Sequence, residues 1–218
     1  AFTLSADRGS ISVLGSINAS GTNGGSISLA AHNNLTLAAG SNLSVAAQKF
    51  DSAGKGGSIL LEAGTQLNGT ANASALLDLQ QGSQIDLGVA AYAAGGYTTN
   101  GSSAFEGKFT GTLHLRAPRT NTDVRVDSIE SKILGASSVV VEAYKIYTPS
   151  GGVLNIAQRN LIHTDSVGFL GDSGLGNANE VAMRGKLLGG ADNAAALDSL
   201  LVISPGVEIL NLSGDLTL

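Results

Sequence analysis

The residues of this chain that could do chemistry are few and scattered. The chain has 218 residues and no cysteine, which excludes thiol catalysis and cysteine-based zinc sites. No two of its three histidines, His32, His114 and His163, have the spacing of metal ligands. His114 alternates with leucines, so we expect it to face solvent from a strand. The sequence therefore predicts neither a metal centre nor a histidine general base, and no cofactor.

Asp78 and Asp86 are the best candidates for a catalytic pair of carboxylates. They occupy matching positions, eight residues apart, in the tripeptides 77–79 and 85–87. Glycosidic cleavage requires two carboxyl groups roughly 5–9 Å apart, a distance that sequence spacing does not define. An aspartate between two leucines is also what the exposed face of a soluble strand shows. A glycan-cleaving site is therefore an alternative, and the preferred interpretation is that the chain is not an enzyme.

Three other patterns are weak versions of known ligand sites. Residues 171–174 (Gly-Asp-Ser-Gly) have only a faint similarity to a calcium-binding glycine turn, and an ordinary turn is preferred. The glycine-rich stretch at 168–176 also differs from a phosphate-binding loop, because no Lys-Ser or Lys-Thr follows it at the required spacing. The densest basic group, Arg116, Arg119 and Arg125, is interpreted as a solvated face. Since the net charge is −5, no nucleic acid partner is expected.

Seven asparagines begin the pattern Asn-x-Ser/Thr, which accepts N-linked glycans in secreted eukaryotic proteins. Asparagine next to a strand can also be structural, because it tolerates left-handed turns and forms stacked side-chain ladders. We favour the structural interpretation and keep glycosylation as the alternative. The seven are Asn18, Asn34, Asn42, Asn68, Asn72, Asn100 and Asn211.

Short, repeated strands must position all of these residues. A phrase in which apolar residues alternate with small polar ones recurs at 10–13, 26–29, 34–37, 42–45 and 58–61, which is typical of half-buried strands. The openings of successive phrases are eight residues apart in the clearest stretch, so three strands would make a coil of about 24 residues. The residues expected to point inward are Ile27, Leu29, Leu35, Leu37, Leu43, Val45, Ile59 and Leu61.

Composition fits a solenoid with a narrow aliphatic core. Aromatic residues are 4% and charged residues 13%, against roughly 25% charged in typical soluble domains. Thirty glycines and three prolines suit many tight turns. The predicted fold is an all-β, three-faced parallel β-helix with about seven to nine coils and two or more loop or short-helix excursions. Such a rod would be roughly 35–45 Å long.

The predicted organisation is one β-helix segment over residues 1–218, as a fragment of a longer chain, because both ends lie in strand-like sequence. Residues 49–56 are interpreted as an inserted loop that makes Ile27 and Ile59 thirty-two residues apart, the other interpretation being four strand steps. Val139–Val141 is expected to be fully buried, 153–156 to be a strand, and Pro205-Gly206 to be a tight turn. The predicted parts are regular coils at 1–89, a loop excursion at 90–111, coils at 112–163, an excursion at 164–198 with short helices at 177–188 and 191–200, and final coil strands at 199–218.

Three longer phrases carry a specific resemblance. They are GGSISLAAHNNLTLAAGSNLSVAA at 24–47, GTLHLRAPRTNTDV at 111–124 and LLVISPGVEILNLSGDLTL at 200–218. They resemble the filamentous haemagglutinin family, the large exoproteins of bacterial two-partner secretion. The resemblance implies a right-handed parallel β-helix, export through an outer-membrane β-barrel transporter, and a secreted or cell-surface location. The secretion domain of that family is not evident, so the chain is similar to the interior of the rod.

The leading functional hypothesis is a non-enzymatic segment of such an exoprotein, acting in adhesion or in extracellular matrix and biofilm structure. A stiff rod would present many weak contacts to a glycan or protein receptor on a cell surface or in the matrix. Tyr92, Tyr97 and Phe105 are the candidate contact residues, because long loops on rigid scaffolds often bind. One alternative is a subunit that self-associates head to tail into an extracellular filament. A second alternative is a polysaccharide-active enzyme.

Overall fold

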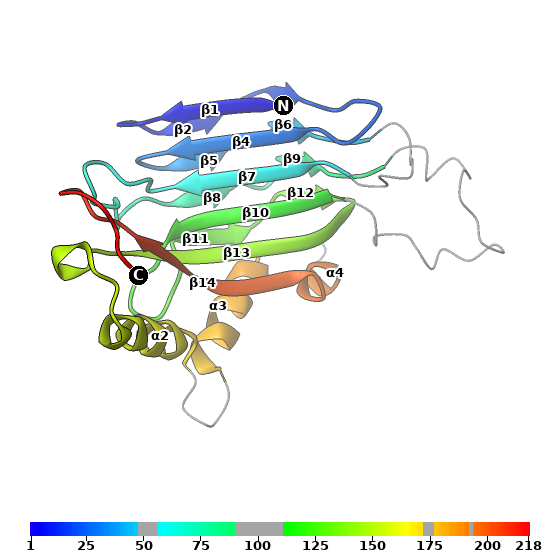
Figure 1. The fold of residues 1–218 in the computed structure, drawn as a ribbon. Helices are drawn as coiled ribbons and strands as arrows, with labels where there is room; N and C mark the ends of the chain where they lie inside the picture. Colours follow the sequence, from blue (N-terminus) through cyan, green and yellow to red (C-terminus); the bar gives the residue numbers. More distant parts are fainter. Residues whose placement is uncertain (48–55, 90–110, 172–176, 192–193) are drawn as a thin grey trace.

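The computed structural model describes residues 1–47, 56–89, 111–171, 177–191 and 194–218. Most of the ordered elements are strands, which form three sheets whose neighbouring strands all run parallel (Figure 1). The six-stranded sheet consists of β1 (Phe2–Ala6), β4 (Ser26–Ala31), β7 (Ser58–Ala63), β10 (Gly111–Pro118), β13 (Ala136–Tyr147) and β14 (Leu201–Ile209). The second sheet consists of β2 (Ile11–Val13), β5 (Leu35–Leu37), β8 (Leu77–Leu79) and β11 (Val126–Ile129). The third consists of β3 (Ser16–Asn18), β6 (Asn42–Ser44), β9 (Gln84–Asp86) and β12 (Lys132–Leu134).

Consecutive strands are distributed to the three sheets in rotation. Each group of three, from β1–β3 to β10–β12, gives one strand to each sheet, and we call such a group a layer. The described residues contain four complete layers, after which β13 and β14 extend only the six-stranded sheet. The expectation of seven to nine coils was therefore too high, because helices occupy much of the chain between β13 and β14.

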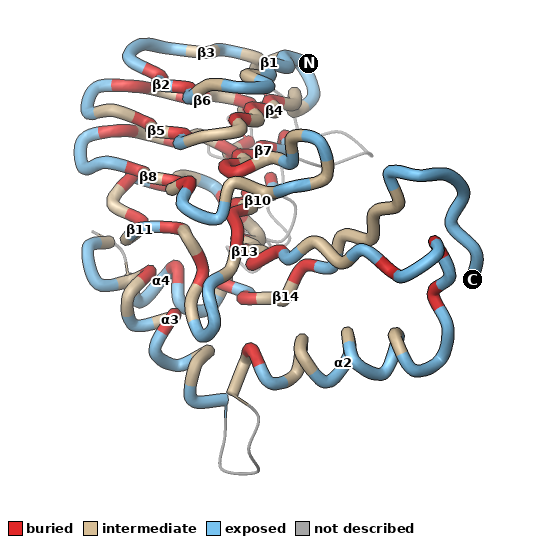
Figure 2. The backbone as a smooth tube through the Cα atoms, turned by 90° about the vertical axis from the view of Figure 1, so that its left-hand side faces the viewer, coloured by how far each residue is buried: buried red, intermediate tan, exposed pale blue. Residues whose placement is uncertain are grey.

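The core lies between the three sheets and is built from aliphatic columns. Leu61, for example, pairs in register with Leu29 on one side and Leu115 on the other, and all three are 0% exposed. Figure 2 shows buried residues alternating with partly exposed ones along these strands, as the period of two requires. All eight residues predicted to point inward are buried, which confirms that prediction.

The register settles the spacing of the repeat. Ile27 pairs directly with Ile59, so these two residues are one layer apart. The interval of thirty-two residues therefore contains three strand steps and additional residues, and the interpretation as four steps is wrong. Residues 48–55, which include most of the predicted insertion, lie outside the described part of the chain.

Buried serines mark the turn between the second and third sheets in successive layers. Ser41, Ser83 and Ser131 each immediately precede a strand of the third sheet and are at most 2% exposed. The hydroxyls of Ser83 and Ser131 are hydrogen-bonded to each other, and Ser83 Oγ donates to the carbonyl of Gln80 (2.6 Å). These contacts give the hydroxyls of Ser83 and Ser131 the partners that burial requires, whereas Ser41 Oγ has no hydrogen-bond partner among the described residues.

Helices cover one end of the layered sheets. They are α2 (Ile156–Leu170), α3 (Ala178–Leu188) and α4 (Ala194–Asp198), together with the short 3-10 helix η1 (Ser150–Gly152). Met183 and Leu187 of α3 and Leu197 of α4 join the hydrophobic core, and α3 packs against β11 and β14. The short helices predicted in this region are present, although α4 is shorter than the predicted 191–200. The expectation of an all-β chain was incomplete.

Helix α2 was not anticipated. Residues 153–156 were expected to form a strand, and the coils were expected to continue to 163. Instead Asn155 caps the helix, its side chain accepting from Gln158 N (3.0 Å) while the Gln158 side chain accepts from Asn155 N (3.2 Å). This capping box satisfies two backbone donors at the first turn and favours helix from Ile156 onward. Val153 keeps only an isolated bridge to Thr217.

One carboxylate of helix α2 contacts several side chains outside the helix. Phe169 is its single buried residue, and Asp165 contacts Arg119, Lys145 and Tyr147. Burial opposes ionisation of Asp165, but hydrogen bonds from Tyr147 and Lys145 and the charge of Arg119 outweigh it and lower the pKa of Asp165. Burial and the bond to Asp165 raise the pKa of Tyr147 to about 12. We call this group the Asp165 latch.

The last strand also differs from the sequence interpretation. Pro205-Gly206 does not form a turn, because β14 runs without interruption and pairs with β13 along its whole length. Proline is tolerated there because β14 is an edge strand. Val139 and Val141 are buried while Val140 is partly exposed, so the expected fully buried run alternates like the other strands. Residues 215–218 form no strand beyond the bridge at Thr217.

Candidate functional site

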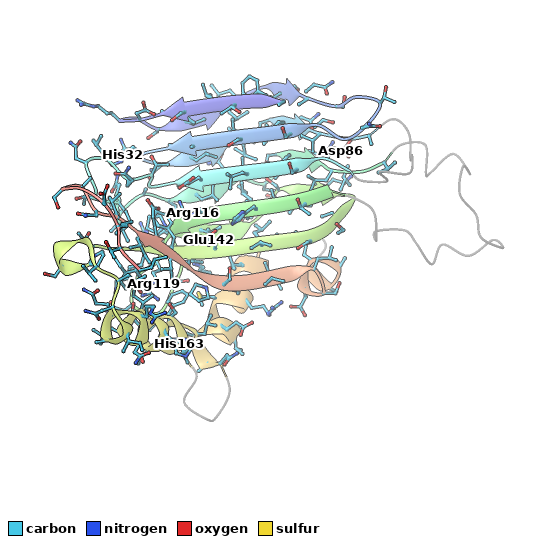
Figure 3. The ribbon with its side chains drawn as sticks, in the orientation of Figure 1. His32, Asp86, Arg116, Arg119, Glu142 and His163 are labelled. Carbon is cyan, nitrogen blue, oxygen red and sulfur yellow. The ribbon has the colours of Figure 1, made fainter. Side chains whose placement is uncertain are left out.

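The outer face of the six-stranded sheet carries a row of polar side chains. Leu61, Leu115 and Val141 point into the core from β7, β10 and β13, so the residue after each points outward. In register these outward residues are Glu62, Arg116 and Glu142, a cation between two carboxylates. Figure 3 shows Arg116 and Glu142 on neighbouring strands of this sheet.

Arg116 binds three carboxylates from three strands. Its Nη1 pairs with Glu62, its Nε lies 3.2 Å from Glu142 Oε1, and its Nη2 lies 2.9 Å from Glu208 Oε2. The arginine side chain is only 16% exposed, and those of the three glutamates are between 16% and 29% exposed. Three partly buried negative charges therefore share one guanidinium.

A buried tyrosine packs against the guanidinium of Arg116. The guanidinium carbon lies 4.0 Å from the centre of the Tyr144 ring, a cation–π arrangement. Tyr144 is 1% exposed, and its hydroxyl donates to the carbonyl oxygen of Gly64. Burial raises the pKa of Tyr144, so it stays neutral at any ordinary pH. Glu62, Arg116, Glu142, Glu208 and Tyr144 are called the Arg116 cluster below.

The environments of two of these carboxylates shift their pKa values in opposite directions. Burial raises the pKa of Glu62 above its ordinary value of 4.5, although Arg116 opposes the shift. The pKa of Glu142 is lowered by the hydrogen bond from His114 and by Arg116, against the effect of burial. His114 Nε2 lies 2.9 Å from Glu142 Oε2. Two carboxylates with diverging pKa values are the arrangement that general acid–base chemistry uses.

A surface pocket of about 480 Å³ opens beside the cluster, and we call it the Arg116 pocket. Its charged lining side chains are Asp7, Glu62, Arg116 and Glu208. Asp7 is exposed and accepts a hydrogen bond from Ser5 Oγ (2.5 Å). The remaining lining residues are Ser5, Thr65, Gln66, Leu67 and Asn68.

A tight hairpin forms one wall of the pocket. Leu67 and Thr70 form an antiparallel bridge across Asn68-Gly69, and both central residues have positive φ, 50° and 81°. This is the Asn-Gly pairing that two-residue hairpin turns prefer. Gln66 Oε1 accepts from Gly69 N (2.8 Å), which fixes the turn further. The wall is therefore held in place by short-range contacts.

A second hollow, of about 560 Å³, is lined largely by backbone. Its walls are formed by Ala1, Gly24, Gly25, Ser26, Gly56, Gly57, Ser58, Gly111 and Thr112. Among the described residues, no charged side chain lines it. The Arg116 pocket is the better candidate, because it combines a hollow with ionisable groups.

The aspartates singled out from the sequence are not brought into a site of this kind. Asp78 lies in β8 and Asp86 in β9, in two different sheets. Asp78 Oδ2 accepts from Gln80 Nε2 (2.8 Å), and Asp86 Oδ1 accepts from Gly88 N (3.0 Å). Each carboxylate is engaged close to its own position in the chain.

The histidines lie in separate parts of the structure: His32 follows β4, His114 lies in β10 and His163 lies in α2 (Figure 3 labels His32 and His163). His114 faces outward with 38% of its side chain exposed, which agrees with the sequence expectation. Among the described residues, no group of three or more His, Asp or Glu side chains is arranged to hold a metal ion. The glycine turn at 171–174 lies largely outside the described residues.

The arginine group was interpreted wrongly. Arg116 belongs to the cluster, and Arg119, whose side chain is 4% exposed, pairs with Asp165. Arg125 Nη2 donates to the carbonyl of Ser74 (3.0 Å). These arginines are partners of specific acceptors from elsewhere in the chain rather than a solvated face. Arg116 lies at an outward position of β10, and Arg119 and Arg125 lie in the connection from β10 to β11.

The candidate contact residues Tyr92, Tyr97 and Phe105 lie outside the described residues, as does the sequon residue Asn100.

Most of the other sequon asparagines form hydrogen bonds within the fold. Asn72 Nδ2 donates to Asn33 Oδ1 (2.8 Å), and Asn211 Nδ2 donates to the carbonyl oxygen of Asp215 (2.7 Å). Asn34 Oδ1 accepts from Leu76 N (2.9 Å). Asn18 Oδ1 accepts from Ser20 N (2.9 Å), Asn42 lies in β6, and Asn68 lies in the pocket hairpin. These contacts suit the structural interpretation, and glycosylation stays a prediction.

Comparison with known proteins assigns no function to this site. No protein-family model matches the chain, and neither the curated proteins nor the solved structures contain a match. No helix in the described part of the chain is long and apolar enough to cross a membrane.

Proposed function

We propose that this chain is a segment of a right-handed parallel β-helix in a large, exported bacterial exoprotein, and that it acts by binding rather than by catalysis. The role proposed is adhesion or the construction of extracellular matrix and biofilm. The observation that carries the proposal is the rotation of strands among three parallel sheets around stacked aliphatic columns. This is the arrangement of a rigid scaffold that displays surfaces at fixed spacing.

The absence of cysteine and the low charge suit export in an unfolded state. Within the same proposal, the export partner is an outer-membrane β-barrel transporter, and the place of action is the cell surface or the medium. The receptor is a glycan or protein of a cell surface or matrix. The filamentous haemagglutinin family, which the strand phrases resemble, provides the precedent for this combination.

Electron microscopy of the native parent protein, labelled with antibody against this chain, tests the proposal. Labelled thin rods or fibres at the surface of the producing cells are expected. Beads coated with the purified chain should also adhere to target cells or matrix more than beads coated with an unrelated acidic protein. Label confined to compact soluble particles, with no bead adhesion, would overturn the proposal.

Head-to-tail stacking into a filament is less well supported. Helices α3 and α4 bury Met183, Leu187 and Leu197 at the end of the layers beyond β11 and β14. A stacked subunit would have to displace them to reach the core. Stacking would show as rods whose length grows with protein concentration.

A polysaccharide-active enzyme is the second candidate, and the Arg116 cluster favours it. Glu62 and Glu142 have pKa values shifted in opposite directions, on a sheet face beside an open pocket. A release of reducing sugar from a glycan that Glu62→Gln abolishes would establish this function. It would also overturn the non-enzymatic proposal.

A further inference from the structure

We propose that the Arg116 pocket binds an amino sugar, a saccharide that carries free protonated amines. This inference deepens the proposed function by naming the ligand class, and its biological meaning rests on that function. The binding itself is a property of the pocket and can be measured separately.

The first argument is charge. Among the described residues, three carboxylates, those of Asp7, Glu62 and Glu208, line the pocket with a single cation, Arg116. Arg116 is shared with a further carboxylate, Glu142, and Asp7 forms no ion pair with any described residue. The pocket therefore carries an excess of negative charge, which favours a cationic ligand and repels an anionic one.

The state of Glu62 agrees with this excess. Burial is the main reason that its pKa is raised, and the charges of Glu208 and Glu142 add to the shift although Arg116 opposes it. The guanidinium of Arg116 is already shared among Glu62, Glu142 and Glu208. An ammonium group placed between Asp7 and Glu62 would supply the charge that these carboxylates lack.

The second argument is the chemistry of the remaining wall. Hydroxyls of Ser5 and Thr65 and amides of Gln66 and Asn68 can donate and accept hydrogen bonds, as the ring hydroxyls of a sugar require. Leu67 is the single apolar residue among the described residues of the lining. A lysine or arginine side chain of a protein partner would need more apolar surface for its aliphatic stem. The wall therefore favours a polyhydroxylated cation over a basic peptide.

The third argument is size and rigidity. A volume of about 480 Å³ lies within the roughly 300–1,000 Å³ typical of small-ligand pockets. The Asn68-Gly69 hairpin and the paired strands hold the walls before any ligand arrives. A preformed site loses less conformational entropy on binding.

Isothermal titration calorimetry on the whole chain tests the inference with three probes. They are a glucosamine tetramer, the same tetramer fully N-acetylated, and tetralysine, each at low and at physiological salt. The glucosamine tetramer should bind at both salt concentrations. The acetylated tetramer should bind at least roughly tenfold more weakly, because it has lost the amines, and so should tetralysine, because it lacks the hydroxyls.

Two variants locate the site. Asp7→Asn and Glu208→Gln should each weaken binding of the glucosamine tetramer roughly tenfold. Asp7 is exposed and outside any strand, so its replacement leaves the fold intact. Asp127→Asn, an equal charge change at an exposed position of β11, is the matched control and should have no effect. Circular dichroism of each variant checks the fold.

The outcomes separate this inference from the proposed function. Equal binding of tetralysine, or equal weakening by Asp127→Asn, would mean that charge alone attracts the ligand and would overturn the inference. No binding of any probe would also overturn it, while adhesion of coated beads could still succeed. Selective binding together with failed bead adhesion would keep the site and overturn the adhesive role.

Discussion

Arg116 and Glu208 lie 92 residues apart in the chain, and their side chains form an ion pair of 2.9 Å between Nη2 and Oε2. The pair connects β10 to β14 across β13, because β13 lies between these two strands in the sheet. The same guanidinium binds Glu62 and Glu142, so a single side chain ties together strands from widely separated parts of the sequence.

Replacement of Arg116 should destabilise the fold strongly. In Arg116→Met, three partly buried carboxylates would face one another without a cation, and breaking such a buried pair costs about 3–5 kcal/mol when burial is complete. Since these side chains are up to 29% exposed, we expect about 2 kcal/mol, measured by urea unfolding. Arg8→Met, which removes an exposed arginine that forms no ion pair with any described residue, should change stability by less than about 0.5 kcal/mol. Similar losses in both variants would contradict the importance of the cluster.

Glu62 should make the protein less stable as pH rises. Its pKa in the folded protein lies above the ordinary value of 4.5, so between these two values the folded protein holds a proton that the unfolded chain has lost. Its stabilising effect is complete below pH 4.5 and is lost as pH rises through the folded-state pKa. Glu62→Gln should therefore gain in melting temperature relative to the parent protein between pH 4 and pH 7.

The comparison between parent and variant isolates Glu62. The lowered pKa values of Glu142 and Asp165 act with the opposite sign, because their stabilisation is lost on acidification, but they act in both proteins. Glu130→Gln, outside the cluster, is the control and should show a constant difference. A constant difference for Glu62→Gln as well would show that the site does not perturb this carboxyl group.

Truncating a buried leucine should lower the free energy of unfolding more than truncating an exposed leucine. Leu61 is 0% exposed and sits between Leu29 and Leu115, so Leu61→Ala would leave a cavity in the middle of a column. The expected loss is about 2–5 kcal/mol in the free energy of unfolding, measured by chemical denaturation. Leu14→Ala, at a position 77% exposed, should cost less than about 0.5 kcal/mol. Equal costs would be inconsistent with a layered aliphatic core.

The Asp165 latch should control the order of α2. Asp165→Asn removes the charge that Arg119 and Lys145 hold, while Phe169 alone remains buried. Hydrogen exchange followed by mass spectrometry should show faster exchange across Ile156–Leu170 and unchanged exchange in β4 and β7. Asp198→Asn, which removes a carboxylate paired with Arg184 at α4, is the control. Unchanged exchange in α2 would show that other contacts hold this helix.

The strands could be predicted from the sequence because their signal is local. Each phrase alternates apolar and small polar residues over a few positions, so the inward residues of β4 to β7 follow directly. Helix α2 could not be predicted from periodicity, because its start depends on the Asn155–Gln158 capping box and it buries little of its surface. The continuity of β14 through Pro205 depends on its being the last strand of the sheet.

Part of the site was present in the sequence and was missed. Aligning the phrases by their terminal alanines, Ala63, Ala117 and Ala143, places Glu62, Arg116 and Glu142 in one outward row. Glu208 could not be found this way. It is in register with Ile146 rather than with Glu142, so its contact with Arg116 depends on the long side chains and on the shape of the sheet.

In this layered fold, the length of a connection between strands does not change how the strands pair. Ile59 pairs with Ile27 before it and Leu113 after it, although the intervals between these residues differ greatly. The long connections from β6 to β7 and from β9 to β10 follow strands of the third sheet, and those from β7 to β8 and from β13 to β14 follow strands of the six-stranded sheet. The turns from the second sheet to the third stay short. Residues added after β6 or β9 would therefore preserve the strand register and would project from the same edge of the layers. The scaffold can therefore accept new segments at repeated, equivalent positions without a new fold.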